Sequence, residues 1–269
     1  MSPRFPYFIA NAFTERSFGG NPAAVMLLEE WLSDEQLLSL AAQHNLSETA
    51  FLVKLGADRF SLRWFTPTSE VPLCGHATLA AAHVLKRELG VTNDVLQFET
   101  RLSGTLTAFE YDHGIAIDLP AISYEPHRVE PALEKALGAA VIRSVRPVQA
   151  PWQVLYELES ERAVRALAPN ISALASAVEH CVIVTARGRD SDFVSRMFAP
   201  QFGVDEDPVT GSAHCILVPF WATELRKRVL RAEQCSARGG TLHCTLHDDR
   251  VTLAGQVVTF AKGEVVAPI

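Results

Sequence analysis

Two short segments of the chain combine a glycine, small neighbours and side chains that can exchange protons. They read Cys74-Gly75-His76-Ala77 and Thr210-Gly211-Ser212-Ala213. Each opens an apolar run that is typical of a buried helix. Glycine lets a ligand approach the backbone, and the first turn of a helix presents unpaired N–H groups at the positive end of its dipole. Both segments therefore predict anion sites suited to a small carboxylate, with Gly75, Ala77, Gly211 and Ala213 among the binding residues.

Four side chains near these segments are candidates for proton transfer. His76 stands at a helix start, where the pKa of an imidazole falls and the neutral ring can shuttle protons. Glu48 stands between a helix and an apolar strand, where burial would raise the pKa of a carboxyl and suit it to acid/base work. Asp207 and Ser212 flank the second glycine. Two ordinary interpretations compete: Glu48 as an exposed residue at a strand start, and Asp207 as a helix cap.

Cys74 precedes the first helix, where the dipole would activate a thiol. Thr210 occupies the corresponding second position, so a symmetric pair of thiols is not available. No grouping of His, Cys, Asp and Glu has the spacing of a metal site, and we predict no metal and no cofactor. The turn at 19–22 lacks the pattern of a phosphate loop.

The chain repeats itself once. The pattern R-x-F-x-P occurs at 63–67 and again 133 residues later at 196–200. The pattern E-x-P-x-x-G-x-A occurs at 70–77 and again 136 residues later at 206–213. A period this long indicates two domain-sized copies rather than a solenoid. We predict an N-terminal half at 1–122 and a C-terminal half at 123–269, with a last strand able to pair back with the first half.

The predicted fold is α+β, with two pseudo-symmetric halves that each form a curled antiparallel sheet or barrel around a central helix. The central helices are expected at 77–89 and 212–225 because these stretches are apolar nearly all round. Another helix should begin at Ser33, which with Gln36 forms a capping box, and should fray near Asn45. The strands are expected at 5–10, 49–54, 60–65, 105–110, 115–119, 152–157, 181–186, 242–246 and 251–253. Two homologous halves facing each other would form a cleft, where we expect the active site.

Composition narrows the class of protein. The 269 residues carry a formal net charge of −7, which argues against broad binding to nucleic acid. No run reaches the roughly 18 apolar residues of a membrane span. The five cysteines form no C-x-x-C pair, which favours reduced thiols in the cytoplasm.

These motifs together resemble the PhzF-like family of phenazine-biosynthesis isomerases, which has the diaminopimelate epimerase-like fold. The matching segments are 18–25, 45–51, 63–67, 74–78, 206–214 and 234–240, and they span nearly the whole chain. The resemblance implies a cofactor-independent isomerase, a homodimer, in which Glu48 moves a proton on a small, amino-acid-like substrate with a carboxylate. It implies that Asp207 holds an amino group or hydroxyl and that His76 and Ser212 assist. Asn21 lies in the first matched segment and is expected to bind substrate.

Two alternatives remain open. One is a two-base racemase or epimerase on the same fold that uses Cys74, and the residue Thr210 argues against it. The other is a binding protein that keeps the fold without catalysis. A scaffold would have no need of Glu48, His76, Asp207 and Ser212 in combination, so catalysis is favoured.

Overall fold

The computed structural model describes residues 4–266, which form two compact units. The first unit contains the residues up to Asp118 and those from Ala254 onward, and the second contains Leu119–Leu253. The predicted second half ran to residue 269, but the segment from Ala254 belongs to the first unit. The reason is the last strand, β18 (Val257–Val266), which pairs antiparallel with β1 (Arg4–Ala12).

The first unit continues after β1 with strands, one flanking helix and one central helix. In chain order these are β2 (Asn21–Leu28), α1 (Asp34–His44), β3 (Glu48–Lys54), β4 (Arg59–Phe65), β5 (Glu70–Val71), α2 (Gly75–His83), the π-helical turn η1 (Val84–Glu88), β6 (Val95–Thr100), β7 (Thr105–Tyr111) and β8 (Gly114–Pro120).

The second unit follows the same plan, with two short helices where the first unit has α1. Its elements are β9 (Tyr124–Pro126), α3 (Pro131–Leu137), β10 (Arg143–Pro147), β11 (Gln153–Glu157), α4 (Glu161–Ala166), α5 (Ile171–Ala177), β12 (Cys181–Arg187), β13 (Phe193–Ala199), the 3-10 turn η2 (Pro200–Phe202), β14 (Val204–Asp207), α6 (Gly211–Leu225), β15 (Val229–Gln234), β16 (Gly240–Leu246) and β17 (Arg250–Gly255).

Strand pairing confirms the duplication. In the first unit β2 runs parallel to β3, β3 antiparallel to β4, β4 parallel to β6 and β6 antiparallel to β7. In the second unit β11, β12, β13, β15 and β16 repeat these pairings in the same order and sense. Each unit is thus a mixed sheet, with parallel pairs as well as the antiparallel ones that were predicted. The parallel pairs arise because a helix separates the two strands in the chain.

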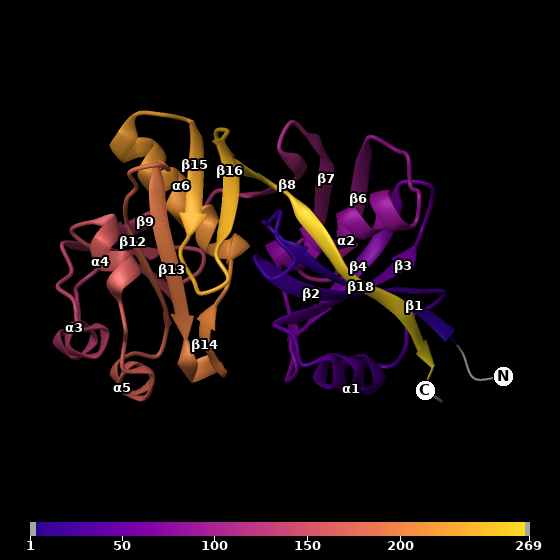
Figure 1. Ribbon diagram of the computed structural model, residues 1–269, viewed down its shortest axis with the longest axis horizontal. Helices are drawn as coiled ribbons and strands as arrows, with labels where there is room; N and C mark the ends of the chain where they lie inside the picture. Colours follow the sequence, from indigo (N-terminus) through magenta and orange to yellow (C-terminus); the bar gives the residue numbers. More distant parts are fainter. Residues whose placement is uncertain (1–3, 267–269) are drawn as a thin grey trace. The chain divides into compact units, whose positions relative to one another are not determined.

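A buried helix lies among the strands of each unit, α2 in the first and α6 in the second (Figure 1). Both begin at the predicted glycine. Helix α6 contains Pro219, which has no N–H to give to the carbonyl of Cys215. The N–H of Ile122 donates to that carbonyl instead, at 2.9 Å, which explains why the helix continues through the proline.

Helix α1 has the predicted ends. Ser33 and Gln36 form both hydrogen bonds of the capping box, and Asn45 closes the helix in the left-handed conformation at φ 50°. Residues 4–266 contain no helix that is long and apolar enough to cross a membrane.

Candidate active site

Glu48 is the first residue of β3, and its position is set by the end of α1. The left-handed Asn45 turns the chain out of the helix, and β3 then runs parallel to β2 with Glu48 paired to Ala23. The neighbours of Glu48 along β3 are buried, whereas its own side chain is 19% exposed. The carboxylate therefore lies at the edge of an apolar layer and stays reachable.

His76, the second residue of α2, lies almost completely buried beside Glu48. Its Nε2 is 3.2 Å from Oε2 of Glu48, although the angle is not that of a hydrogen bond. Its Nδ1 is 3.2 Å from the side-chain amide nitrogen of Asn21. Because this amide nitrogen can only donate, Nδ1 accepts and the ring carries its proton on Nε2, facing Glu48. This tautomer follows from the assigned orientation of the amide.

The imidazole is neutral at physiological pH. Burial lowers the pKa of His76 to about 3, in the direction expected for desolvation of a cation. A neutral ring leaves Glu48 as the charged group of the pair. A carboxylate with a neutral N–H donor beside it can accept a proton and return it.

Cys74 is the residue before α2 and is 5% exposed. Its Sγ is 3.5 Å from Nδ1 of His76, and its carbonyl accepts a hydrogen bond from Thr78 Oγ1 at 2.5 Å. One ligand-type atom each of Glu48, Cys74 and His76 lies within 4.8 Å of the other two. We predicted no such grouping from the sequence because it joins residues of β3 and of the α2 start, which local spacing does not connect.

In the second unit, Asp207 ends β14 and is linked to the start of α6. Its Oδ2 accepts from Thr210 Oγ1 at 2.5 Å. The fully buried side chain of Gln234 donates to the Asp207 carbonyl at 2.8 Å and accepts from the Thr210 N–H at 2.8 Å. The carboxylate thus sits beside a helix N-terminus in a fixed orientation, which combines the capping interpretation with access to a ligand.

Ser212, the second residue of α6, accepts a hydrogen bond from Gln153 Nε2 at 3.3 Å. Gln153 begins β11 and is 4% exposed. Each unit therefore directs a carboxamide from the start of a corresponding strand, β2 or β11, at the second residue of its central helix. Sequence reasoning missed Gln153, and only the duplication offers a signal for it, since Asn21 and Gln153 open equivalent strands.

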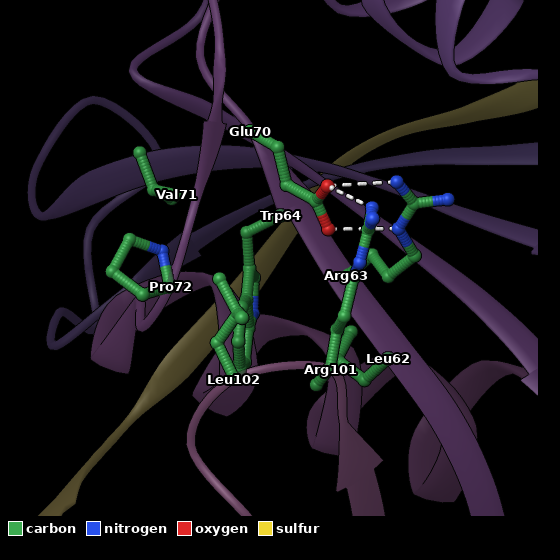
Figure 2. A pocket seen from close by; sticks show the side chains of 8 residues that line it. All are labelled: Leu62, Arg63, Trp64, Glu70, Val71, Pro72, Arg101 and Leu102. Carbon is green, nitrogen blue, oxygen red and sulfur yellow. Dashed lines mark hydrogen bonds and ion pairs between the residues drawn. The ribbon is translucent and has the colours of Figure 1, made fainter.

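A bidentate ion pair supports the approach to each helix. Arg63 donates from Nε and Nη2 to the Glu70 carboxylate at 2.8 and 2.7 Å, and Arg196 does so to Glu206 at 2.7 and 2.9 Å. Figure 2 shows Glu70 held between Arg63 and a second arginine, Arg101, beside a small surface pocket of about 150 Å³. These pairs link the two motifs of each repeat.

A serine hydroxyl holds the proline of each E-x-P motif. Ser103 Oγ donates to the Pro72 carbonyl at 2.7 Å, and Ser236 Oγ donates to the Pro208 carbonyl at 2.8 Å. Both prolines lie three residues before the glycine that starts the central helix. The hydroxyls therefore position the segments that lead into α2 and α6.

The structure thus brings the sequence-predicted residues together within each unit. The first unit assembles Asn21, Glu48, Gly75, His76 and Ala77, and the second assembles Asp207, Gly211, Ser212 and Ala213. Asn21 is fully buried with its amide directed at His76, so its contact with substrate stays a prediction.

Known proteins define the class of enzyme. The chain is 50% identical to an uncharacterised isomerase of Pseudomonas aeruginosa over 95% of its own length and 96% of the relative's. A solved PhzF-family phenazine biosynthesis protein of Enterococcus faecalis matches with a TM-score of 0.92 and 42% identity, covering 98% and 99% of the two chains. A predicted epimerase of Pseudomonas aeruginosa, 19% identical with a TM-score of 0.72 over 98% and 99%, shares the fold.

Fold and relatives together define an isomerase with an epimerase-like fold. The model of the phenazine biosynthesis-like protein family (PhzC-PhzF) matches residues 10–263. The chain belongs to this family.

Proposed function

We propose that the protein isomerises a small, amino-acid-like substrate with a carboxylate by moving a proton from one substrate carbon to another. Glu48 is the general acid/base. Its carboxylate accepts the proton, the electron pair of the broken C–H bond enters the π system of the substrate, and the proton returns from Glu48 to a different carbon. Charge and atoms balance without an external reagent, so the proposed reaction needs no cofactor.

The pair of Glu48 and His76 carries this proposal. Their 3.2 Å contact places a neutral N–H donor beside a partly exposed carboxylate at a helix N-terminus. The first-turn N–H groups of α2, at Gly75 and Ala77, would stabilise the negative charge of a substrate carboxylate. The charge on Glu48 disfavours an anion directly beside it, so the carboxylate is expected at the N–H groups and the reacting carbon at Glu48.

The second unit is proposed to recognise the remainder of the substrate. Asp207 has its Oδ2 engaged by Thr210, and the carboxylate is suited to bind an amino group or a hydroxyl. Ser212 offers a hydroxyl whose orientation is limited by Gln153. The N–H groups at Gly211 and Ala213 supply a second set of donors. The protein is also proposed to act as a homodimer in the cytoplasm.

Deuterium incorporation tests the proposal. The protein is incubated in heavy water with cyclic and acyclic amino acids and with acids similar to 3-hydroxyanthranilate, and mass shifts are measured. We expect at least one acid to gain deuterium with wild-type protein and not with Glu48→Gln. Turnover that survives dialysis against a chelator would support the absence of a metal requirement.

A two-base racemase that uses Cys74 is the principal alternative. The position 133 residues after Glu48 holds Cys181, whose thiol has a pKa raised to about 12 by burial, so a thiolate base is scarce there. Thr210 takes the place of Cys74 in the second unit. Alkylation of Cys74 that abolishes turnover while Glu48→Gln stays active would favour this alternative.

A binding protein without catalysis is the second alternative. It predicts saturable binding of a small acid with no deuterium incorporation into any compound of the panel. The proton-transfer arrangement of Glu48, His76 and Asn21 would then have no use. We therefore favour the enzyme, in agreement with the named isomerases among its relatives.

A further inference from the structure

We propose that Glu48, Cys74 and His76 form a binding site for Zn²⁺ and that the bound cation inhibits the enzyme. Carboxylate, thiolate and imidazole are three ligand types that Zn²⁺ takes in proteins. Three protein ligands leave the fourth tetrahedral position for water or a substrate oxygen. The site lies within the first unit.

The separations fit one cation. Tetrahedral bonds of about 2.0 Å to nitrogen and 2.3 Å to sulfur place these ligand atoms roughly 3.5 Å apart. The separation between Cys74 Sγ and His76 Nδ1 is 3.5 Å. The Glu48 oxygen lies within 4.8 Å of both ligand-type atoms. A cation at the centre of this triangle requires the ligands to move inward by roughly half an ångström, and the partly exposed Glu48 side chain has room to do so.

Charge favours the complex in a buried place. The Cys74 thiol and the His76 ring are 95% or more buried. On binding, the S–H bond of Cys74 breaks, the proton leaves to buffer, and sulfur bonds to zinc as thiolate. The dication is then balanced by one thiolate and one carboxylate, so no net charge remains buried. The positive end of α2 opposes a cation but favours the thiolate.

Asn21 is the competitor for this nitrogen, because its amide nitrogen lies 3.2 Å from Nδ1 of His76. Metal binding must therefore displace this contact. A zinc ion would occupy Glu48 and His76 at once, and loss of turnover is the expected consequence. This inhibition rests on the proposed function, whereas the binding itself does not.

Calorimetric titration of the untagged, chelator-treated protein with zinc chloride tests the site. We expect one Zn²⁺ per chain with a dissociation constant below about 1 µM, and release of about one proton, measured from the dependence of the heat on the buffer. Cobalt(II) in place of zinc should show a sulfur-to-metal charge-transfer band. Cys74→Ser and Glu48→Gln should each weaken binding by more than about 100-fold, since removing even the partner of a ligand costs about 10- to 100-fold.

Cys235→Ser is the matched control, because Cys235 is the most exposed of the five thiols and lies in the second unit. It should bind Zn²⁺ as the wild type does. Unchanged affinity in folded Cys74→Ser, or absence of stoichiometric binding by wild type, would overturn the site. Binding at this site without any effect on deuterium incorporation would keep the metal site but overturn the inhibition, and it would count against Glu48 and His76 in turnover.

Discussion

The side-chain amide nitrogen of Asn21 lies 3.2 Å from Nδ1 of His76, on the opposite side of the ring from the nitrogen that faces Glu48. This contact decides which nitrogen carries the proton, because the amide can only donate. In the second unit the amide of Gln153 reaches Ser212 in the same manner. The two units thus keep the same support for the second residue of their central helix, although the supported side chains differ.

Asn21→Asp should lower turnover more than Asn21→Ala does. The carboxylate has the shape of the amide but accepts hydrogen bonds only, so it would draw the proton to Nδ1 and leave Nε2 without one. Asn21→Ala removes the donor and should cost about tenfold, the equivalent of one hydrogen bond of about 1.4 kcal/mol. Rates of deuterium incorporation measure both. Full activity of Asn21→Asp would show that the assigned tautomer is wrong.

Arg63→Ala should destabilise the protein by about 1–3 kcal/mol, because it leaves Glu70 without its bidentate partner in a partly buried place. The Arg63 side chain is 11% exposed and that of Glu70 is 20% exposed. Arg101→Ala is the control, since Arg101 contacts the same carboxylate but is 58% exposed. Its cost should stay within about 0.5 kcal/mol. Unfolding in urea measures both, and equal losses would contradict the difference in burial.

Ser103→Ala and Ser236→Ala should each reduce the turnover number about fivefold with little change in stability. Each removes one hydroxyl, worth about 1 kcal/mol, that holds the proline carbonyl before a central helix. Ser103→Thr keeps the hydroxyl and should restore most of the rate. A rate that falls equally in Ser103→Thr would argue against positioning by this hydrogen bond.

Stability should decline as the pH falls from about 6.5 towards 4, in part because of His214. Its ring is fully buried, its Nδ1 donates to the Thr210 carbonyl at 2.8 Å, and burial lowers its pKa to about 4. The unfolded chain, with an ordinary pKa of about 6.5, binds a proton that the folded state refuses. The contribution is complete above pH 6.5 and falls by up to about 1.4 kcal/mol per pH unit below it.

His214→Leu removes this group and should flatten the dependence. Urea unfolding at pH 7.5 and pH 5 compares the two proteins, and the buried His44 and His180 contribute equally to both. The same change in unfolding free energy in wild type and variant would exclude His214 as a source.

The sequence predicted the parts of the fold that repeat. Matched motifs located the duplication, and apolar runs located both central helices to within two residues at their starts. The end of the first helix differs, because α2 stops at His83 and continues as the π-helical turn η1 to Glu88. An apolar pattern does not distinguish the hydrogen bonding of the two forms.

The parts that were missed depend on contacts distant in the chain. Gln153 has no local pattern, since its importance arises from the neighbouring start of α6. The ion pair between Arg63 and Glu70 lies inside motifs that were already matched, and its repetition at Arg196 and Glu206 was a signal that could have revealed it. The grouping of Cys74 with Glu48 and His76 needed the register of β3 against β2, which the sequence does not give.

Deuterium incorporation by wild type, Glu48→Gln and Asp118→Asn is the most direct test of the central claim. Asp118, in the first unit at β8, is a matched acidic control outside the candidate site. The account predicts deuterium at a substrate carbon with wild type and Asp118→Asn, and a loss of at least about 100-fold with Glu48→Gln, the scale of general acid/base catalysis. Full exchange by a folded Glu48→Gln protein would contradict it.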